Sequence, residues 1–239
     1  MQNVAKAKPI ADHRIEVAAR KRALTRARIL DATIKVYTAN VNRQPVIEDV
    51  VREAGISRGS FYLHFQSLEE AFHAVAELQS DQFTKDILPV YDFLKEPWQR
   101  FSVGFRIFLK RAQADPDWAS FVTRSHAVSA KLLVGGYMRE DLRRGQEMGQ
   151  FSMADIEVAL DFMLGASSAG IYALGMGVPD PERYMNASVR MALVGIGCSK
   201  TLCDKAVSFS DQYLSGWQLG NVFDADSDSA KPQTRRMKG

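Results

Sequence analysis

Apolar residues recur at intervals of three and four along most of the chain, which is the spacing of one face of an α-helix. The clearest case is a stripe at positions i, i+3, i+4 and i+7, made by Ile47, Val50, Val51 and Ala54. Gly55 follows this stripe, and glycine enters the left-handed conformation that ends a helix at no steric cost. The pattern therefore predicts a short helix that ends at about residue 54.

A second short helix is predicted directly afterwards, over about residues 58–65. Ser57 is its candidate N-cap, because a serine hydroxyl can accept a hydrogen bond from a free backbone N–H. Phe61 and Phe65 are four residues apart and can pack inward against the preceding helix. Two short helices joined by a glycine-containing turn form a helix-turn-helix.

The other side chains of this second helix are expected to face outward, where they suit the surface of duplex DNA. Arginine offers a charged fork for phosphate or guanine, and hydroxyl groups bond phosphate oxygens. A glycine lets the backbone approach a sugar-phosphate strand, and a histidine can donate a ring N–H to phosphate. The expected outward residues are Ser57, Arg58, Gly59, Ser60, Tyr62, Leu63 and His64. The alternative is a plain helical hairpin within a bundle, which has no use for so polar a face.

At these residues the sequence resembles the tetracycline-repressor-like (TetR/AcrR) family of bacterial transcription regulators. Three segments carry the resemblance: residues 25–32 (TRARILDA), 49–65 (DVVREAGISRGSFYLHF) and 67–71 (SLEEA). They lie in about the first third of the chain. The resemblance implies an all-α fold, with an N-terminal three-helix helix-turn-helix DNA-binding domain and a C-terminal helical domain for ligand binding and dimerisation.

Two positions depart from the family pattern. The family usually has threonines just before the first helix of the motif, where this chain has Pro45 and Val46. Pro45 can still open a helix, but a hydroxyl cap and a phosphate contact are lost. Val46 occupies the position of a DNA-contacting residue in the family, so it stays among the residues expected to face DNA. A lysine usually follows the serine after the recognition helix, and here Leu68 replaces it.

The helix-turn-helix is expected to lie within a DNA-binding domain of residues 18–66. Its first helix is predicted over about residues 18–40, where Leu30, Ile34 and Tyr37 form a stripe that covers the hairpin. Arg26 and Arg28, near the start of that helix, can reach a phosphate. Residues 1–17 lack strong periodicity, and we expect a mobile basic arm there, of the kind that can enter a minor groove.

Residues 67–220 are expected to form the helical effector-binding and dimerisation domain, and residues 221–239 a disordered tail. Ser67 and Glu70 predict a capping box in which Glu70 bonds the serine N–H. Long apolar helices are expected over about 153–176 and 181–203. Small residues within them favour a four-helix interface between two copies of the chain; ordinary core packing within one subunit is the alternative. The two expected seams are Ile156, Leu160, Met163, Ser167, Gly170, Ile171 and Leu174, and Tyr184, Ser188, Met191, Ala192, Gly195, Ile196 and Ser199.

An effector pocket is expected among the helices of residues 83–175, which are rich in aromatic side chains. This richness predicts an apolar or aromatic effector. Any single one of these side chains can equally be plain core. The candidate walls are Phe83, Phe101, Phe105, Phe108, Trp118, Phe121, Tyr137 and Tyr172.

Charge is distributed unevenly along the 239 residues, whose net charge is +3. Residues 1–66 hold 12 Lys and Arg against 6 Asp and Glu, whereas residues 67–239 hold 19 against 22. A basic front end joined to a mildly acidic body fits a phosphate-binding head on a body that avoids DNA.

The sequence offers little for other chemistry. Four histidines lie in unrelated places, and no metal-ligand or nucleophile motif is present, so neither an enzyme nor a metal or cofactor site is expected. Cys198 and Cys203 are expected to be buried reduced thiols in one helix. Residues 162–179 carry no charge, but their glycines and serines favour a buried helix over a membrane span. We expect a cytoplasmic protein.

Together, these patterns and the family resemblance imply a ligand-responsive transcription regulator, most simply a repressor, that binds a near-palindromic DNA operator as a homodimer and responds to a small-molecule effector. The alternative is a ligand-independent architectural DNA-binding protein whose C-terminal domain only dimerises. The roughly 170 residues after the head exceed what a dimer seam needs, which favours an effector pocket.

Overall fold

The computed structural model describes residues 10–39, 44–124 and 132–215. Within these ranges the chain is helical, and it divides into two compact units, residues 1–76 and 77–239. The first unit contains α1 (Ile10–Ala39), α2 (Ile47–Ala54), α3 (Arg58–Tyr62) and the start of α4 (Leu68–Asp86). The division falls inside α4, ten residues after the expected domain boundary.

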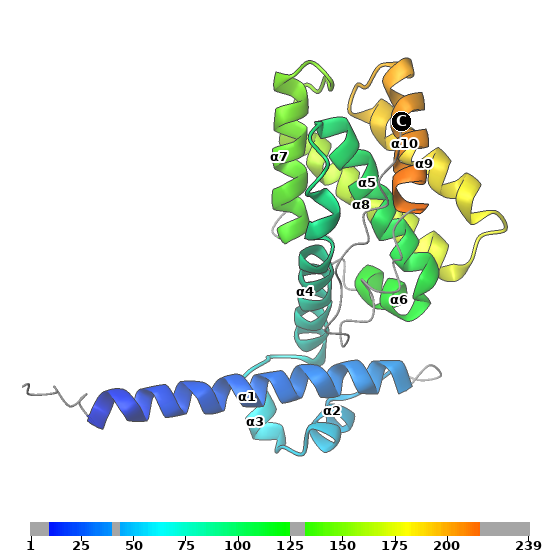
Figure 1. The fold of residues 1–239 in the computed structure, drawn as a ribbon. Coiled ribbons are helices and arrows are strands. Elements are labelled where there is room, and N and C mark those ends of the chain that lie inside the picture. The colour runs from blue at the N-terminus through cyan, green and yellow to red at the C-terminus, as the bar shows by residue number, and fades with distance from the viewer. Residues whose placement is uncertain (1–9, 40–43, 125–131, 216–239) are drawn as a thin grey trace, which may run out of the picture. The chain divides into compact units, whose positions relative to one another are not determined.

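The second unit begins with the end of α4 and the 3-10 turn η1 (Leu88–Tyr91). It continues through α5 (Pro97–Ala114), α6 (Pro116–Arg124), α7 (Leu133–Glu147), α8 (Ile156–Met176), α9 (Pro181–Gly195) and α10 (Lys200–Ser215). Helix α5 packs against α6, α7, α8, α9 and α10, as Figure 1 shows. It is apolar on more than one side, as a helix inside a core must be. The buried apolar residues of α5 include Phe101, Val103, Phe105, Ile107, Phe108 and Leu109.

Three expected helix boundaries were wrong. The helix expected over residues 58–65 ends at Tyr62, with Leu63 as its C-cap, so Phe65 lies beyond it. Helix α1 begins at Ile10, so residues 10–17 of the expected mobile arm are helical; residues 1–9 and the expected tail at 221–239 lie outside the described residues. Pro9 directly precedes this helix in the sequence. Proline has no N–H to bond the carbonyl four residues earlier, so it is disfavoured inside a helix but tolerated at a helix start. Residues 15–23 of α1 are exposed, so this part of the helix needs no apolar stripe, and the sequence there shows no helical periodicity.

The helix expected over residues 181–203 is two helices. Gly197 has a φ of +77°, and the Cys198 N–H reaches back 3.0 Å to the Leu193 carbonyl, which ends α9. Ser199 then caps α10 by accepting a hydrogen bond from the Leu202 N–H at 3.3 Å. A Cβ at Gly197 would clash with the Ser152 carbonyl oxygen, so only glycine fits there.

The two cysteines are free and buried, although they lie in different elements from those expected. Cys198 lies in the link between α9 and α10, and Cys203 lies on α10. Burial raises the pKa of Cys198 to about 12, so its thiol stays protonated at neutral pH.

The capping box before α4 forms with one change of partner. The Ser67 hydroxyl accepts from the Glu70 N–H at 3.1 Å, as expected. The Glu70 carboxylate accepts from the Gln66 N–H, not from the Ser67 N–H. The same two side chains therefore cap the helix, but the Glu70 carboxylate bonds the backbone N–H one residue earlier than expected.

Arg106, on α5, is fully buried and joins α5 to α9 and α10 through hydrogen bonds. Its Nε donates to the Ser210 hydroxyl at 3.0 Å, and its Nη1 donates to the Asp211 carboxylate at 3.2 Å. Its Nη2 donates to the side-chain oxygen of Asn186 on α9. Burial lowers the pKa of Arg106, and Asp211 and Glu182 oppose that effect. The fully buried guanidinium is thus satisfied by side-chain groups of two other helices and ties those helices to α5.

Arg106→Met is expected to lower the free energy of unfolding by about 3 kcal/mol, because it removes several charged hydrogen bonds that join α5 to α9 and α10 inside the core. Urea denaturation followed by circular dichroism measures this. Arg190→Met is the matched control, since Arg190 also joins α9 to α10, through Asp204, but at the exposed surface. That change is expected to cost under about 1 kcal/mol. Equal losses in both variants would contradict the role given to Arg106.

Candidate DNA-binding surface and effector cavity

The turn between α2 and α3 is built as the sequence indicates. Gly55 has a φ of +60° and a ψ of +44°, which is the left-handed conformation. The Ile56 N–H bonds the Val51 carbonyl at 3.0 Å, closing the end of α2. The Ser57 hydroxyl oxygen accepts from the Ser60 N–H at 3.1 Å and caps α3. These features set the direction in which α3 leaves the turn.

Helix α3 has one buried side and one exposed side. Phe61 and Phe65 are buried, with ring centroids 5.9 Å apart. Tyr62 is exposed, and Leu63 is 73% exposed. Ser57, Arg58 and Gly59 are also exposed, whereas Ser60 and His64 are half-buried. The apolar residues therefore anchor the helix, and its polar side is open to a partner.

Arg58 is held in place at this surface by two neighbours. Its Nη1 lies 2.9 Å from the Glu48 carboxylate, and its Nη2 lies 3.4 Å from the Tyr62 hydroxyl. The guanidinium also lies 5.8 Å from the centre of the Tyr62 ring. Arg58 and Tyr62 thus form one positioned pair, and Glu48 neutralises part of its charge in the free protein.

Arg28 and Val46 lie at the two ends of α2. The Arg28 Nη2 donates to the Ala54 carbonyl and, at 3.3 Å, to the Gly55 carbonyl. It therefore satisfies the negative end of the helix, a favourable place for a cation. Val46 is the N-cap, exposed and extended, and its N–H donates to the Asp49 carboxylate at 3.1 Å. Asp49 thus supplies the N3 half of a capping box, whereas the N-cap hydroxyl that a threonine would provide is absent.

Two arginines of α1, Arg22 and Arg26, border α3, and Arg26 was expected to reach a phosphate. The Arg22 Nη2 donates to the Leu63 carbonyl at 3.5 Å, and the Arg26 guanidinium lies 5.2 Å from the centre of the Phe65 ring. His64 lies beside them; burial lowers its pKa first, and the charges of Arg22 and Arg26 lower it further. The excess of basic charge in residues 1–66 was a signal for these contacts, but periodicity could not predict which arginines contact α3.

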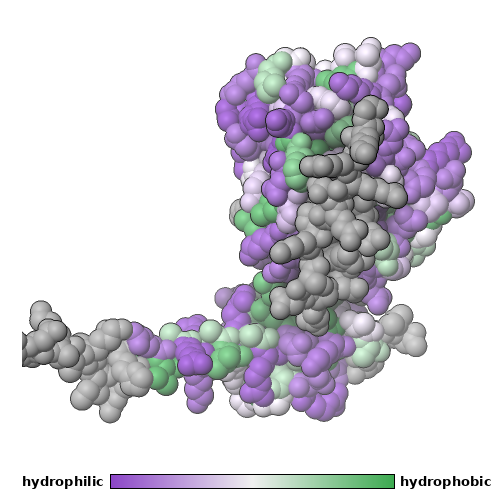
Figure 2. Space-filling view, viewed as in Figure 1, coloured by the Kyte–Doolittle hydropathy of each residue, from purple (hydrophilic) through white to green (hydrophobic). Residues whose placement is uncertain are grey.

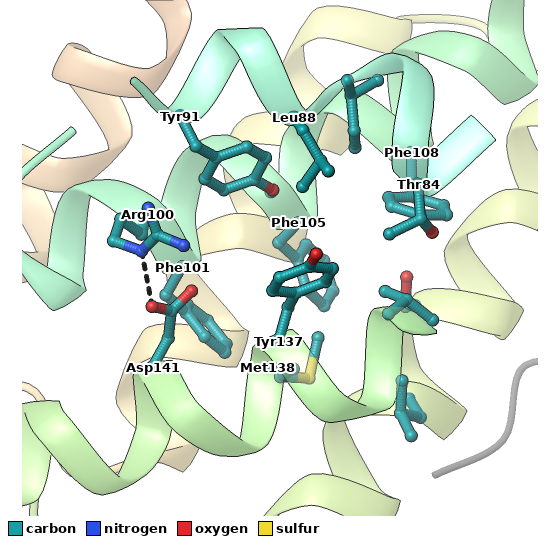
Figure 3. Close-up of a pocket in the computed structure, with 15 residues that line it drawn as sticks. Thr84, Leu88, Tyr91, Arg100, Phe101, Phe105, Phe108, Tyr137, Met138 and Asp141 are labelled. Carbon is teal, nitrogen blue, oxygen red and sulfur yellow. Dashed lines mark hydrogen bonds and ion pairs between the residues drawn. The ribbon is translucent and has the colours of Figure 1, made fainter. Parts of the chain in front are cut away.

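A cavity of about 50 Å³ lies within the second unit, between η1 and helices α5, α7 and α8. Most of its wall is apolar, and phenol and hydroxyl groups interrupt it. Figure 3 shows the Tyr91 and Tyr137 hydroxyls facing the open space. The lining residues are Thr84, Ile87, Leu88, Tyr91, Arg100, Phe101, Gly104, Phe105, Phe108, Val134, Tyr137, Met138, Asp141, Leu164 and Ser167.

One end of the cavity carries a buried ion pair. The Arg100 Nε donates to the Asp141 carboxylate at 2.6 Å, and the Arg100 guanidinium lies 4.9 Å from the centre of the Tyr91 ring. Burial raises the pKa of Asp141, and Arg100 opposes that effect. Burial also raises the pKa of Tyr91, so its phenol stays neutral. A Cβ at Gly104 would clash with the Tyr91 hydroxyl oxygen, so this glycine makes room for the phenol.

Four of the eight expected aromatic walls line the cavity: Phe101, Phe105, Phe108 and Tyr137. Phe83, Trp118 and Phe121 are buried in the core outside it, and Tyr172 is exposed on α8. The polar lining was missed. Arg100 and Asp141 are 41 residues apart, so no local spacing could pair them.

The expected dimer seam of α8 was wrong in detail. Ile156 is half-buried, and the other residues of this seam are buried in the subunit's own core. A surface that contacts a second copy must be exposed in the single subunit, so these residues cannot form it. The stripe expected on α9 mixes exposed and buried residues, and Ser199 lies beyond that helix.

A different apolar stripe is exposed on α8, at Val158, Phe162, Ala169, Tyr172 and Met176. Helix α9, which packs against α8, exposes Ala187, Met191 and Val194. Phe162 and Met191 are 73% and 75% exposed. The face of the second unit seen in Figure 2 is mainly hydrophilic with scattered hydrophobic residues, so an ordered apolar stripe on two neighbouring helices indicates a protein contact.

Helix α8 is also the one helix among the described residues that is long and apolar enough to cross a membrane. Its buried side packs in the core, and its exposed side is the stripe just described. Those two faces account for its hydropathy without a bilayer.

A helix-turn-helix with a polar recognition face, joined to a helical body that encloses a cavity, defines a helix-turn-helix transcription regulator. Residues 29–75 match the family model of bacterial regulatory proteins of the tetR family, and residues 96–197 match that of the tetracyclin repressor-like C-terminal domain. This chain belongs to the TetR family.

In sequence, the chain is similar to the HTH-type transcriptional regulator SrpR of Pseudomonas putida, with 33% identity over 65 residues. It is equally similar to the uncharacterised HTH-type transcriptional regulator TtgW, also of Pseudomonas putida, again at 33% over 65 residues. Each alignment covers 27% of this chain, and they cover 30% and 48% of those relatives.

Among solved structures, the chain is similar to RolR in complex with resorcinol, with a TM-score of 0.65 and 25% identity. That match covers 81% of this chain and 96% of RolR. The structure of RolR without ligand matches with a TM-score of 0.60 and 23% identity, over 77% of this chain and 95% of that one.

Proposed function

We propose that this protein is a ligand-responsive transcriptional repressor of the bacterial cytoplasm. The observation that carries the proposal is the two-sided α3, anchored by Phe61 and Phe65 and open on its polar side. The cavity in the second unit favours a ligand-responsive regulator over an architectural protein, which has no need for one.

On DNA, the exposed side of α3 enters the major groove. Arg58 and Tyr62 act as a pair, Gly59 allows close approach, and Arg22 and Arg26 on α1 contact phosphates beside them. Arg28 keeps its bonds to the end of α2 and adds charge at the flank. The proposed DNA-contacting set is Arg22, Arg26, Arg28, Val46, Ser57, Arg58, Gly59, Ser60, Tyr62, Leu63 and His64.

The protein acts as a homodimer through the exposed stripes of α8 and α9. A two-fold axis brings the same surface patch of both copies together, so the α8 and α9 stripes of the two copies form a four-helix interface. Two recognition helices then reach successive major grooves about 34–36 Å apart, so the operator is near-palindromic.

The effector is a small aromatic molecule in the cavity. RolR, whose structure holds resorcinol, supports this size and class. Helix α4 carries Thr84 of the cavity at one end and is capped by Ser67, directly after the helix-turn-helix, at the other. We expect α4 to adopt two orientations, only one of which spaces the two DNA-binding domains of the dimer correctly for the operator. A ligand that binds one orientation more tightly shifts the population toward it, by no more than the difference between its affinities for the two.

Sequencing the DNA fragments that the purified protein retains from a genomic library tests this function. A near-palindromic motif with half-sites one helical turn apart is the expected result. A gel shift on that motif, with and without a small aromatic compound, then tests the ligand response. Retention of DNA without any shared motif would refute the repressor assignment.

Gly59→Ala is expected to weaken operator binding by about tenfold or more while raising the melting temperature slightly. The new Cβ meets nothing nearer than 4.0 Å within the protein, and alanine favours a helix over glycine by about 1 kcal/mol. On DNA, the same Cβ holds the backbone away from the sugar-phosphate strand. Fluorescence anisotropy and thermal melting measure the two effects. Unchanged operator affinity would show that Gly59 does not face DNA.

Operator affinity is expected to rise as the pH falls from about 8 to about 6, because a phosphate beside His64 favours the charged ring whose pKa is lowered below 6.5 in the free protein. Operator affinity is expected to change with pH between the lowered pKa of His64 in the free protein and its higher pKa in the complex with DNA. Folding responds in the opposite sense: the unfolded histidine binds a proton more readily, so stability is lost as the pH falls below 6.5. His64→Gln should flatten the affinity profile; an unaltered profile would place the phosphate elsewhere.

A further inference from the structure

The cavity has an apolar wall and a polar end, and the polar end restricts which molecules can bind there. Phe101, Phe105 and Phe108 offer ring faces and edges to a flat ligand. Figure 3 shows Arg100 and Asp141 side by side at one end of the cavity, with the Tyr91 and Tyr137 hydroxyls facing the space. A ligand must therefore combine an aromatic ring with hydrogen-bonding groups at its rim.

The charges in the lining balance. Arg100 and Asp141 are the charged residues of the lining, and their side chains are 20% and 7% exposed. The cation is already paired with the carboxylate at 2.6 Å. Arg144 acts on Asp141 from outside the lining, and its Nη2 donates to the Lys95 carbonyl. A ligand carboxylate would bring a second negative charge against Asp141 in a desolvated site, which is costly without a further cation.

The hydrogen-bonding groups of the polar end suit hydroxyls. A carboxylate accepts about four hydrogen bonds, and Arg100 uses one through its Nε, so Asp141 can accept from a ligand O–H. Within the described ranges, the hydroxyls of Tyr91 and Tyr137 make no hydrogen bond to another residue, and a phenol both donates and accepts. One ring hydroxyl can thus bond Asp141 while another bonds a tyrosine.

The size of the cavity restricts the ligand to one ring. Its 50 Å³ is well below the roughly 150 Å³ of an engineered apolar cavity that binds benzene. Binding must therefore move the lining, and Tyr137, which is exposed, and the flexible Met138 are the side chains best able to move. Both lie on α7, so entry of a ring displaces α7 side chains from η1 and α5.

We propose that the cavity binds an uncharged single-ring aromatic with at least two hydroxyl groups, and that Asp141 and Tyr91 select these against aromatic carboxylates. Asp141 accepts the proton of one hydroxyl in a hydrogen bond, Arg100 keeps Asp141 ionised and oriented, and Tyr91 bonds the second hydroxyl. This inference rests on the proposed effector-responsive function and names the chemistry of its ligand.

Isothermal titration calorimetry on the full-length protein tests it with resorcinol, phenol, 3-hydroxybenzamide and 3-hydroxybenzoate. The last two have the same shape and differ in charge. Resorcinol is expected to bind about tenfold more tightly than phenol, and the amide about tenfold or more tightly than the carboxylate. Failure of resorcinol to bind, or binding of the carboxylate as tight as that of the amide, would overturn the proposal.

Variants assign the selectivity to residues. Asp141→Asn should abolish the preference for the amide and weaken resorcinol about tenfold or more, whereas Glu140→Gln, the neighbouring exposed acid on α7, should change neither. Tyr91→Phe should weaken resorcinol to the level of phenol with the charge preference intact. It keeps the ion pair, so it decides the matter if Asp141→Asn does not fold. Wild-type resorcinol affinity in a folded Tyr91→Phe or Asp141→Asn variant would refute the assignment.

Operator binding without ligand separates this proposal from the proposed function. A protein that recognises its operator but ignores every compound tested retains its DNA-binding role and refutes the ligand class. A protein that binds resorcinol as expected but retains no specific DNA refutes the repressor function instead.

Discussion

Arg58→Ala is expected to weaken operator binding by about 100-fold or more while leaving the melting temperature unchanged. A bidentate arginine contact contributes about 1–3 kcal/mol, and a dimer makes it twice. Arg58 is exposed, and its bonds to Glu48 and Tyr62 are surface contacts, so the fold loses little with them. Fluorescence anisotropy with the selected operator measures the affinity.

Glu48→Gln is the companion to that variant. It removes the carboxylate that lies 2.9 Å from the Arg58 guanidinium and takes a negative charge away from the DNA-facing surface. Operator affinity is expected to rise several-fold, with a steeper dependence on salt concentration. Normal operator affinity in Arg58→Ala would show that α3 does not read DNA through this residue. An affinity loss in Glu48→Gln would show instead that Glu48 orients Arg58 productively.

Phe162→Asp is expected to convert the dimer to monomers at micromolar concentration and, through this, to weaken operator binding by about 100-fold or more. The side chain is 73% exposed in one subunit, and burying it at a two-fold axis contributes about 2–3 kcal/mol from each copy. The aspartate would instead place two like charges near the axis. Sedimentation velocity measures the oligomeric state, and circular dichroism shows that the subunit stays folded.

Phe93→Asp is the matched control for the interface. Phe93 is 66% exposed, lies between η1 and α5, and belongs to neither stripe. Its replacement is expected to leave the sedimentation coefficient unchanged. A dimer that survives Phe162→Asp, or dissociates equally in both variants, would remove the α8 stripe from the interface.

The helix-turn-helix could be predicted in detail because its determinants are local. Gly55 ends α2 through its own backbone preference, and Ser57 caps α3 through a bond to a residue three positions on. Phe61 is buried on the inner side of α3, and the Phe65 N–H bonds the Phe61 carbonyl at 3.0 Å just after the helix ends, which places Phe65 beside it in the core. Each of these features depends on neighbours within a few residues, which a pattern of residue types records.

The sequence by itself determined the all-helical class, most of the helix boundaries and the anchored side of α3. Only the tertiary structure decided which apolar stripe of α8 is core and which is exposed, because both stripes have helical spacing. Likewise, the packing of α5 against distant helices decided that Arg100 meets Asp141 and that Arg106 meets Ser210, pairs 41 and 104 residues apart. Hydrogen-bond and charge pairing at that range follows from how the helices pack, and the chain's local preferences carry no record of it.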